Sequence, residues 1–414
     1  MTESSSAPIA YVLWKFPKLS ETFVVEELLA LERRGLLPVV IACERPDEQR
    51  FHPGVPSLTG RTVWIGELSR SSRLAACAAT VARHPWRFIS CARSALRSPG
   101  RVSLANLGRS LVVARIAEQR GIRYLHAHFA DVAGEIACSA ARLAGVRFGV
   151  TIHGADIYVR PRTLRLVVGS ASLRVTVCEY NVTEIVRRCP GTSRSDFLIK
   201  YAGVDTKRVR LPSSRPKRPG RQIVAVGRLV PKKGFGVLLQ AISLLALTFP
   251  TQVSCVIVGS GPEEAELRSV ASRLGIAGQV DFLGDRSPGE VLELMAAADV
   301  LAAPCTISAW GDRDSMPVVL KEAMALELPV VASDDFGIPE LVTAATGLLV
   351  PRDDPEALAA ALAQVLRMPA EQRAAMGQAG RVVVEERFCE DAGAELLVRA
   401  FYDLLGDLPA RSGT

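Results

Sequence analysis

The sequence lacks two features that define large classes of protein. No stretch reaches the ~18 uncharged residues that a membrane-spanning helix requires, so no transmembrane segment is predicted. The nine cysteines include no CxxC pair, which is typical of reduced, buried thiols and indicates neither a zinc site nor a disulfide framework. Glu3 stands where a secretory leader carries positive charge, so we expect no signal peptide and a cytoplasmic location.

The composition excludes further classes. The 414 residues correspond to two or three domains at ~150 residues each. With 49% hydrophobic, 22% charged and 6% aromatic residues, the chain is neither disordered nor collagen-like. The net charge of +7 favours phosphate groups, nucleic acid or an anionic membrane surface without selecting among them. Nucleic acid is the weakest of these partners, because the basic run at 206–222 has no aromatic residue on which bases could stack.

Short β-rich segments alternate with helical patterns, which predicts an α/β fold with parallel sheets built from βαβ units. Ser20 is the expected N-cap of the first helix, and Gly35 suits its end. Strands are expected at 9–16, 38–43, 61–66, 123–129, 147–153, 173–178 and 197–203, and then at 222–229, 253–260, 279–284, 299–305 and 329–333.

The alternation is interrupted once, by the proline-rich basic segment 206–222, which reads as an interdomain linker. We therefore predict two doubly wound, Rossmann-like domains, at 1–205 and 223–389. A C-terminal helix at 390–414 is expected to pack back on the first domain. Ligands of such sheets bind at the carboxyl ends of the strands, so the active site is expected in a central cleft between the two domains.

One helical stretch is a candidate for peripheral membrane contact. It runs from Leu74 to Ala92 and is interrupted by Arg83, His84 and Arg87. These charges prevent it from crossing a bilayer but suit the anionic inner face of the cell membrane. The surface helix of a soluble domain is the simpler interpretation.

In the segment 311–333, the acids Asp314 and Glu322 stand eight positions apart. Pro317 suits the first turn of a helix, so the backbone N–H groups of Val318 and Val319 are predicted to point out of the helix start. Such a terminus binds phosphate. Glu322 would then lie within the helix and accept hydrogen bonds from sugar hydroxyls.

A second candidate site follows the strand at 222–229. Gly227 is succeeded by Arg228 and Lys233 at the carboxyl end of that strand. A guanidinium and an ammonium placed there suit a diphosphate, because the first binds oxygens in pairs and the second acts as a point charge. The simpler interpretation, a pair of solvated loop cations, loses weight because the acidic segment follows in the same domain.

These motifs together resemble the retaining glycosyltransferases of the GT4 group, which have the GT-B fold, and most of all the colanic-acid branch that builds extracellular polysaccharides. The similarity covers almost the whole chain. The motifs that carry it are FPKLSETFVVEEL (16–28), HAHFADVAGEIA (126–137), FGVTIHGADIYV (148–159), GRLVPKKG (227–234), GSGPEEAEL (259–267), DRDSMPVVLKEAMALELPVVAS (312–333), GIPELV (337–342) and GLLVPRDDPEALAAAL (347–362).

The resemblance implies a role for each matching residue. Glu322 is expected to bind the ribose of the donor nucleotide, and His153 to face the donor sugar from the first domain. The diphosphate is expected to be bound by Arg228, Lys233 and the backbone of Val318 and Val319, with Gly227, Gly259 and Gly261 in the loops of the donor site. The acceptor is expected near Ser20, Glu21 and His128, the last of which has an equally good structural interpretation.

One position departs from the family pattern. The first acid of the pair is usually glutamate, and the aligned residue here is Asp314, which is shorter by one methylene, or ~1.5 Å. This acid is expected to contact the hydroxyls of the donor sugar. The departure therefore implies that the donor binds deeper in its site, that the enzyme prefers a different donor, or that its catalytic activity is low. Asp312 and Asp314 also form a DxD pair, which we attribute to coincidence, because the cations and the helix start already supply the countercharge that a metal would provide. No metal and no cofactor are therefore predicted.

The implied reaction moves a hexosyl group from a nucleotide-diphosphate sugar, with UDP-sugars as the commonest donors, to a hydroxyl group with retention of configuration. The acceptor is a glycan, a lipid-linked oligosaccharide at the inner membrane face or a soluble natural product. Two other functions remain open: a nucleotide-sugar epimerase of the same fold, and a nucleotide-sugar-binding scaffold protein that has lost catalysis, for which Asp314 is the only support.

Overall fold

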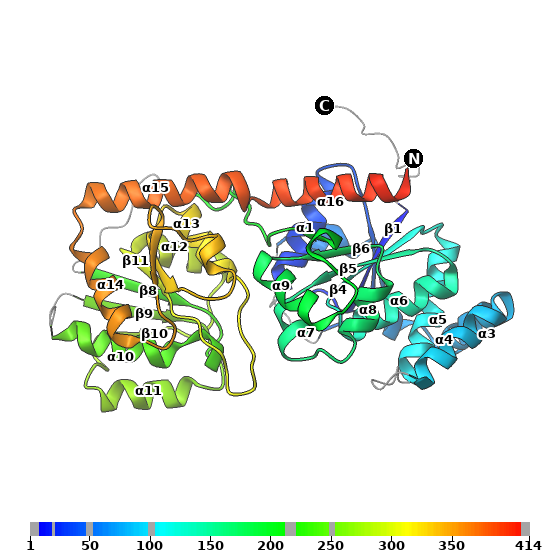
Figure 1. The fold of residues 1–414 in the computed structure, drawn as a ribbon, viewed down its shortest axis with the longest axis horizontal. Coiled ribbons are helices and arrows are strands. Elements are labelled where there is room, and N and C mark those ends of the chain that lie inside the picture. Colours follow the sequence, from blue (N-terminus) through cyan, green and yellow to red (C-terminus); the bar gives the residue numbers. More distant parts are fainter. Residues whose placement is uncertain are drawn as a thin grey trace. The chain divides into compact units, whose positions relative to one another are not determined.

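The computed structural model describes residues 8–18, 21–46, 53–97, 104–211, 221–247 and 253–406. The chain divides into two compact units. The first comprises the chain up to Val177, Asn181–Lys200 and the chain from Gly393, and the second comprises Cys178–Tyr180 and Tyr201–Ala392. Each unit is a sheet with helices packed against it (Figure 1), which confirms the predicted α/β class.

The first unit contains a parallel sheet with the order β3-β2-β1-β4-β5-β6-β7 among the described strands. The chain adds strands outward from β1 in one direction and then from β4 in the other, so the β1/β4 pair is the topological switch point. In this pair Ile9 aligns with Tyr124. The strands are β1 (Ile9–Lys15), β2 (Val39–Glu44), β3 (Thr62–Trp64), β4 (Tyr124–His128), β5 (Arg147–Ile152), β6 (Leu173–Thr176) and β7 (Phe197–Ile199).

Helices cover this sheet because its central strands are apolar on both faces, as parallel strands usually are. Every residue of β1 from Ile9 to Leu13 is buried. The helices that begin in this part of the chain are α1 (Thr22–Glu32), α2 (Val55–Thr59), α3 (Arg70–Arg83), α4 (Pro85–Arg97), α5 (Leu104–Gln119), α6 (Val132–Ala144), α7 (Gly154–Tyr158), α8 (Leu164–Ser170) and α9 (Glu179–Arg188).

The last helix, α16 (Glu390–Leu405), contributes to the core of the first unit. Leu397, Val398 and Phe401 are buried in one cluster with Tyr11 of β1 and Leu28 of α1. Apolar contact of this kind supplies roughly 25 cal/mol for each Å² removed from water, so this part of α16 is an integral layer of the unit.

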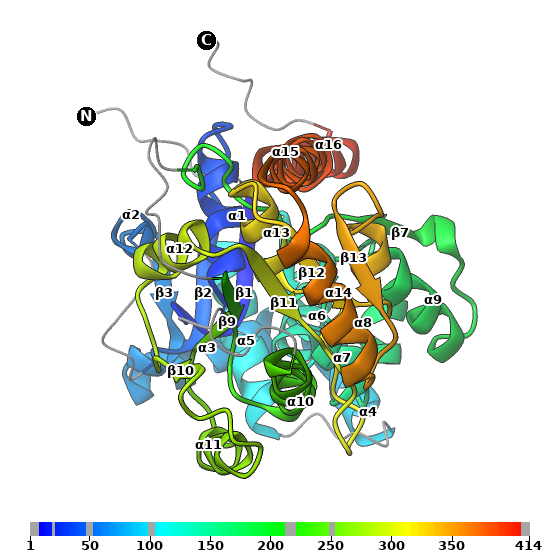
Figure 2. The same ribbon diagram turned by 90° about the vertical axis from the view of Figure 1, so that its left-hand side faces the viewer.

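The second unit repeats the same topology. Its described strands have the parallel order β10-β9-β8-β11-β12-β13, with the switch point between β8 and β11. Helices α10 and α14 pack together on one face, where their apolar side chains form a single core with β8 and β9 (Figure 2). The elements are β8 (Arg221–Val226), α10 (Phe235–Ala246), β9 (Val253–Val258), α11 (Glu264–Arg273), β10 (Val280–Phe282), α12 (Pro288–Ala297), β11 (Val300–Ala303), α13 (Val318–Ala325), β12 (Val330–Ser333), β13 (Gly347–Val350), α14 (Pro355–Arg367) and α15 (Ala370–Arg387).

Twelve strands lie at the positions predicted from the sequence, and one strand was missed. β13 (Gly347–Val350) pairs with β12 at the edge of the second sheet. The linker predicted at 206–222 was drawn too long at both ends. Val209 is buried, and Arg221 is already the first residue of β8. The predicted N-cap Ser20 lies outside the described residues, and α1 instead follows Glu21, which makes no side-chain capping bond.

The helix predicted from Leu74 to Ala92 was wrong as a single element. The structure contains two helices, α3 and α4, separated at His84, which has φ −133° and ψ 57°. The cause is Pro85, because the residue before a proline is disfavoured in helical geometry and the proline has no N–H for the preceding turn. Among the described residues no helix combines the length and apolarity needed to cross a bilayer.

Candidate functional site

The loops that follow β8 and β11, residues 227–234 and 304–314, begin side by side at the carboxyl edge of the second sheet. In α/β sheets this switch point is where ligands bind. The two loops are in direct contact: the Thr306 N–H donates to the carbonyl of Lys232 at 2.9 Å. A Cβ atom on Gly234 would collide with the carbonyl of Pro304, so only glycine permits this approach.

The predicted glycines of the donor site bring a third loop into this edge. Gly227 and Gly259 have φ values of 155° and 126°, which favour glycine. A Cβ on Gly259 would collide with the carbonyl of Gly227, and a Cβ on Gly261 would lie 2.7 Å from the backbone nitrogen of Leu229. The loops after β8 and β9 therefore pack backbone against backbone, and the Leu229 N–H donates to the carbonyl of Ser260 at 2.9 Å.

A cluster of charged side chains lies on these loops. Lys233 Nζ lies 2.5 Å from Asp314 Oδ2, and Lys232 Nζ lies 3.1 Å from Asp314 Oδ1 and 3.2 Å from Asp312 Oδ1. Arg228, on the same loop, is exposed and close enough to act electrostatically on Lys233. Three cations face two carboxylates, so the edge keeps a net positive charge.

The two carboxylates of the DxD pair thus share Lys232 as their countercharge. Sequence reasoning missed Lys232, although its position beside Lys233 was a signal. It also treated Lys233 and Asp314 as ligands of different parts of the donor, whereas the structure makes them partners of each other.

Both members of this ion pair are charged. Burial of Asp314 opposes its ionisation, but the attraction of Lys233 and Lys232 is larger and holds the pKa of this carboxyl at about 2. Burial likewise opposes the charge of Lys233, and Asp314 outweighs it, so the pKa of Lys233 lies above its ordinary value. Lys233 therefore remains an ammonium throughout the physiological pH range.

Helix α13 begins directly after this cluster. Its N-cap is Pro317, one position earlier than the first-turn placement predicted from the sequence, and no side chain caps the helix. The first N–H groups of an α-helix have no acceptor within the helix, and in α13 these include Val318 and Val319. Both residues are half-buried, so this terminus adds partial positive charge beside the lysines.

Glu322 lies in the second turn of α13 and is half-buried. The rotation of the helix is fixed by its neighbour Lys321, which is completely buried and donates to the carbonyl of Ala202 at 2.5 Å. The carboxylate of Glu322 can accept hydrogen bonds but not donate them, and this suits a pair of ribose hydroxyls as donors.

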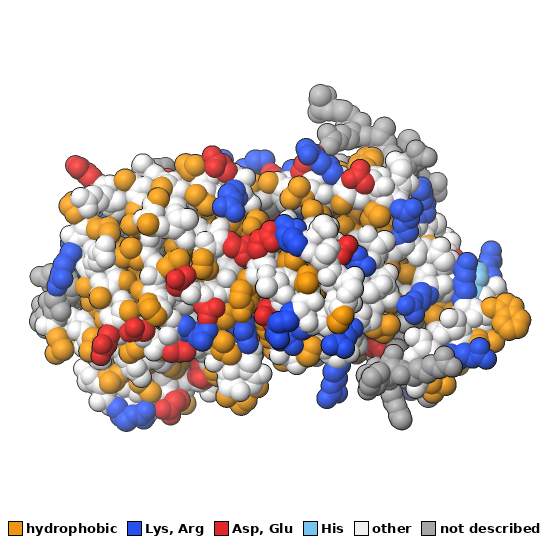
Figure 3. Space-filling model, viewed as in Figure 1, with side chains coloured by type: hydrophobic (Ala, Val, Ile, Leu, Met, Phe, Trp, Pro, Cys, Tyr) orange, Lys and Arg blue, Asp and Glu red, His pale blue; other side chains and the backbone are white. Residues whose placement is uncertain are grey.

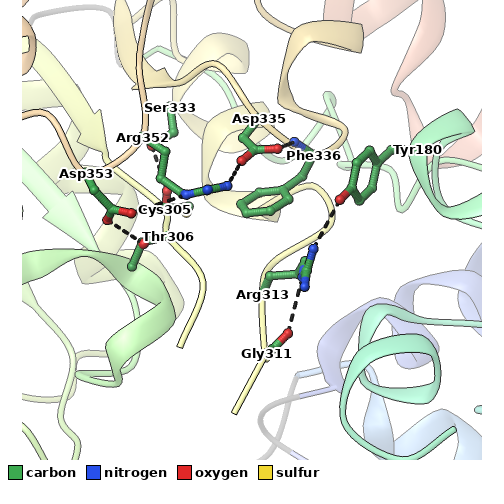
Figure 4. A network of polar contacts seen from close by, with 10 residues as sticks. All are labelled: Tyr180, Cys305, Thr306, Gly311, Arg313, Ser333, Asp335, Phe336, Arg352 and Asp353. Atoms are coloured by element: carbon green, nitrogen blue, oxygen red, sulfur yellow. Dashed lines mark hydrogen bonds and ion pairs between the residues drawn. The ribbon is translucent and has the colours of Figure 1, made fainter. Parts of the chain in front are cut away.

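A second network braces the loops of the same edge (Figure 4). Arg352, after β13, forms ion pairs with Asp335 and, at 3.2 Å, with Asp353. Asp353 in turn accepts from Thr306 Oγ1 at 2.5 Å. The loops after β11, β12 and β13 are therefore tied together by one guanidinium and two carboxylates.

The ring of Phe336 lies between two arginines in this network (Figure 4). The guanidinium of Arg313 is 5.8 Å from the ring centroid and that of Arg352 is 6.0 Å away, which are cation–π distances. Phe336 has a φ of 59°, rare for a residue with a side chain. Arg313, which separates the two acids of the DxD pair, also donates to the Tyr180 hydroxyl at 3.2 Å. Sequence reasoning singled out neither arginine.

His153 lies in the first unit, directly after β5 and before α7. Its Nε2 is 3.1 Å from Nδ1 of His128, the last residue of β4, and the two rings are stacked. Phe23 and Phe129 pack on the His153 ring at centroid distances of 4.8 and 4.5 Å. Burial and the neighbouring His128 hold the pKa of His153 well below its ordinary value, so the ring is neutral.

The histidine pair is connected to a buried ion pair. Nε2 of His128 lies 3.0 Å from Oε1 of Glu27 on α1, and Oε2 of Glu27 lies 2.9 Å from Nζ of Lys200. The Tyr11 hydroxyl donates to Oε1 of Glu27 at 2.8 Å. Burial opposes the charge of Glu27, but Lys200 and His128 prevail and lower its pKa well below the ordinary value.

Among the described residues, Glu27, His126 and His128 have side-chain atoms close enough to share a metal, within 4.8 Å of one another. Their hydrogen bonds are already directed elsewhere: His126 contacts Tyr124 at 3.0 Å and Thr151 at 2.8 Å. Burial also lowers the pKa of His126 to about 3. With Lys200 supplying the positive charge beside Glu27, the donor set does not fit a second cation.

Three further residues of this unit lie in the motifs on which the family resemblance rests. Asp156 is buried, accepts the backbone N–H of His153 at 2.8 Å and has its pKa raised to about 8 by burial. Glu21, a predicted acceptor residue, forms an ion pair with Lys18 at 2.6 Å. Ser20, the other predicted acceptor residue of that loop, lies outside the described residues.

Comparison with known proteins identifies relatives over most of the chain. Residues 210–383 match the model of the family described as glycosyl transferases group 1. A colanic acid biosynthesis glycosyltransferase of Escherichia coli K12 is 28% identical over 403 residues, covering 92% of this chain and 96% of the relative. A GDP-mannose-dependent phosphatidylinositol monomannoside mannosyltransferase of Mycolicibacterium smegmatis is 30% identical over 341 residues, covering 77% and 87%.

Solved structures share the fold. The Anabaena protein HepE, determined in complex with UDP, superposes with a TM-score of 0.71 at 19% identity and covers 95% of this chain and 99% of its own. A Rickettsia africae glycosyltransferase superposes with a TM-score of 0.70 at 14% identity and covers 96% and 99%. These similarities confirm the predicted GT-B fold, with two Rossmann-like sheets.

Proposed function

Because the chain belongs to the group 1 glycosyl transferases and is therefore a transferase enzyme, we propose that it moves a hexosyl group from a nucleotide-diphosphate sugar to a hydroxyl group, with retention of configuration. The observation that carries this proposal is the charged edge at the β8/β11 switch point, where Lys232, Lys233 and Arg228 lie on one loop. A site of this charge suits a diphosphate leaving group.

In the proposed reaction the bond between the anomeric carbon and the diphosphate oxygen breaks while the acceptor oxygen bonds to the same face of that carbon. The acceptor proton passes to the departing diphosphate. Negative charge accumulates on the phosphate oxygens during this step, so catalysis requires positive charge that is already in place. Lys233, held by Asp314 at 2.5 Å, supports that role, as do Arg228 and the start of α13 at Val318 and Val319.

Other residues are proposed to bind the rest of the donor. Glu322 binds the ribose hydroxyls, and the loops that contain Gly227, Gly259 and Gly261 receive the nucleotide. Asp314 contacts the donor sugar, and His153 contributes to the same sugar site. The relatives differ in base, since one is named as GDP-mannose-dependent and one was solved with UDP, so the experiment includes both.

The central experiment measures transfer and donor hydrolysis with a panel of UDP-sugars and GDP-mannose. Lys233→Ala and Glu322→Ala are expected to lower turnover, the first by roughly 10²–10³-fold, as when one preorganised group is removed. Lys207→Ala is the matched control, because this lysine of the same unit is exposed and pairs only at the surface with Asp391. Equal activity in all three variants would refute the assigned donor site.

Binding can be tested without an acceptor. A nucleotide at a hundred times its dissociation constant stabilises the folded protein by ~2.7 kcal/mol, which is a clear rise in melting temperature. The shift is expected with UDP or GDP and is expected to be lost in Lys233→Ala. Formation of a C2 epimer without acceptor would favour the epimerase, and a shift without any turnover would favour the scaffold.

We further propose that the acceptor is a lipid-linked glycan and that the first unit contacts the cytoplasmic face of the membrane through α3 and α4. Residues 68–97 contain six arginines and no acid. Leu74, Trp86 and Leu96 are 71%, 81% and 81% exposed, and hydrophobic side chains lie together with basic ones over this end of the unit (Figure 3). Exposed Trp and Leu beside arginine suit an anionic bilayer.

A further inference from the structure

Trp310 lies on the loop that follows β11 and is 76% exposed, although tryptophan is highly buried on average. Two other tryptophans have defined partners. The Trp64 indole N–H donates to the carbonyl of Phe16 at 2.8 Å. The guanidinium of Arg109 lies 4.8 Å from the ring of Trp14. In the part of the chain that the structure describes, the ring of Trp310 has no such hydrogen bond or cation contact, so both of its faces are open to a ligand.

The turn that carries Trp310 is closed by three hydrogen bonds. The Ser308 N–H donates to the carbonyl of Asp312 at 2.9 Å, and the Asp312 N–H donates to Ser308 Oγ at 2.9 Å. The Gly311 N–H donates to the carbonyl of Ser308 at 2.8 Å. Gly311 has a φ of 84°, which favours glycine. The backbone that presents the ring is thus already ordered, and a ligand does not have to order it on binding.

This turn is anchored to the charged edge of the second sheet. Asp312 pairs with Lys232 at 3.2 Å. Nε of Arg313 donates to the carbonyl of Gly311 at 3.2 Å (Figure 4). Trp310 is two residues from Asp312, so the Cα atoms of these two residues are at most ~7.6 Å apart. A ligand on the Trp310 ring would therefore lie close to the residues proposed to bind the donor.

The strand order separates Trp310 from the proposed nucleotide site. The nucleotide is proposed to bind the loops after β9 and β8, whereas the loop of Trp310 follows β11, on the other side of β8. The donor sugar does not suit an open ring, because an activated sugar must be shielded from water to avoid hydrolysis. An acceptor glycan extends into solvent. The face of an indole ring carries partial negative charge, which attracts the polarised C–H bonds on one face of a pyranose.

The residues around Trp310 do not suit a membrane. Asp312 and Asp314 follow it in the same loop, and carboxylates oppose contact with an anionic bilayer. The other exposed tryptophan, Trp86, lies in the segment 68–97, which contains six arginines and no acid. The two exposed tryptophans therefore suit ligands of different chemistry, and carboxylates beside Trp310 can accept hydrogen bonds from sugar hydroxyls.

We propose that Trp310 is a stacking residue that binds a pyranose ring of the glycan acceptor, so that the second unit contributes to acceptor selection. The assignment of this sugar to the acceptor rests on the proposed function. Stacking of a sugar on the ring is a property of the protein alone. Trp310 thus raises the affinity for acceptors that carry a sugar ring, and not for other alcohols.

The first test is the ¹H–¹⁵N spectrum of the indole N–H groups in the full-length protein, which has four tryptophans. The probes are the methyl glycosides of glucose, galactose and mannose, each with and without UDP or GDP. The control is sorbitol, which has hydroxyl groups but no ring. At least one glycoside is expected to shift the Trp310 signal, which is identified by its loss in Trp310→Phe. No shift with any glycoside, or an equal shift with sorbitol, would overturn the proposal.

Steady-state kinetics with a glycoside that accepts transfer give the second readout. Trp310→Ala is expected to raise the KM of the acceptor roughly tenfold, as truncation of an aromatic contact does, and to leave the KM of the donor nearly unchanged. Trp310→Tyr keeps an aromatic face and should recover most of the loss, whereas Trp310→Leu should not. Leu247→Ala is the matched control, because Leu247 of the same unit is 84% exposed. An equal rise of both KM values would place the ring in the donor site and overturn the proposal.

These outcomes separate the stacking site from the proposed function. A shifted Trp310 signal in a wild-type protein that shows neither transfer nor donor hydrolysis would contradict the proposed function and support the stacking site. Transfer by Trp310→Ala with the wild-type KM for the acceptor would do the opposite. Weaker sedimentation of Trp310→Ala with anionic vesicles would assign the ring to the bilayer and overturn the proposal.

Discussion

Nζ of Lys233 and Oδ2 of Asp314 lie 2.5 Å apart, although the two residues follow different strands, β8 and β11. The cation proposed for the diphosphate is therefore held by the acid proposed for the sugar. This contact couples the two parts of the donor site, so the aspartate that departs from the family pattern has a consequence for phosphate binding as well as for sugar binding.

Asp314→Asn is expected to separate donor binding from turnover. Without the carboxylate, Lys233 loses its partner and becomes available to the diphosphate, while Lys232 keeps Asp312 at 3.2 Å. The Kd of UDP or GDP should therefore fall, while kcat should drop roughly 10²-fold because Lys233 and the sugar lose their fixed partner. Asp314→Glu keeps the charge and should recover most of kcat. The measurements are calorimetric titration and steady-state kinetics. Weaker nucleotide binding in Asp314→Asn would contradict the coupling.

Gly261→Ala is expected to damage the contact between the loops after β8 and β9. The added Cβ would lie 2.7 Å from the backbone nitrogen of Leu229, so one loop must move, at about 1–3 kcal/mol of unfolding free energy. Nucleotide affinity should fall with it. Gly278→Ala is the control, since nothing lies within 4 Å of its Cβ. Denaturant melts and nucleotide titrations compare the two variants, and equal behaviour would argue against this loop contact.

Asp156→Asn is expected to change how stability depends on pH. Burial raises the pKa of this carboxyl from 3.8 to about 8, so the folded protein holds a proton that the unfolded chain has released. Stability therefore falls as the pH rises between these values, by up to about 1.4 kcal/mol per pH unit. The asparagine variant lacks this dependence, while the histidines act equally in both proteins. Urea melts from pH 5 to 8 should show the difference between them changing steadily, and a constant difference would disprove the raised pKa.

Trp86→Ser combined with Leu96→Ser is expected to weaken binding to vesicles that contain anionic lipid by at least roughly tenfold, because burial of each apolar side chain is worth about 1.5–3 kcal/mol. Co-sedimentation of the protein with anionic and with neutral vesicles measures this binding. Leu247→Ser is the control, because Leu247 of the second unit is equally exposed, at 84%. If the wild-type protein sedimented equally with both kinds of vesicle, α3 and α4 would not be a binding surface for anionic lipid.

The local pattern predicted the strands well, because the central strands of a parallel sheet are short apolar runs and can be read one at a time. The edge strand β13 was missed: only two of its four residues are buried, so its pattern was weak. The sequence also indicated the break between α3 and α4, because Pro85 disfavours a continuous helix. The apolar residues on both sides of Pro85 led us to predict a single helix instead.

The sequence by itself determined the two α/β units, the glycine loops and the family, since each depends on residues that are close together in the chain. Only the tertiary structure decided which side chains meet. Lys232 and Asp312 are 80 residues apart, and Glu27 and His128 are 101 residues apart. Their contacts arise because each sheet is wound outward from its centre, which brings the carboxyl ends of β8 and β11, and the surroundings of β1 and β4, together. Strand order is a property of the whole packed sheet, and no local spacing encodes it.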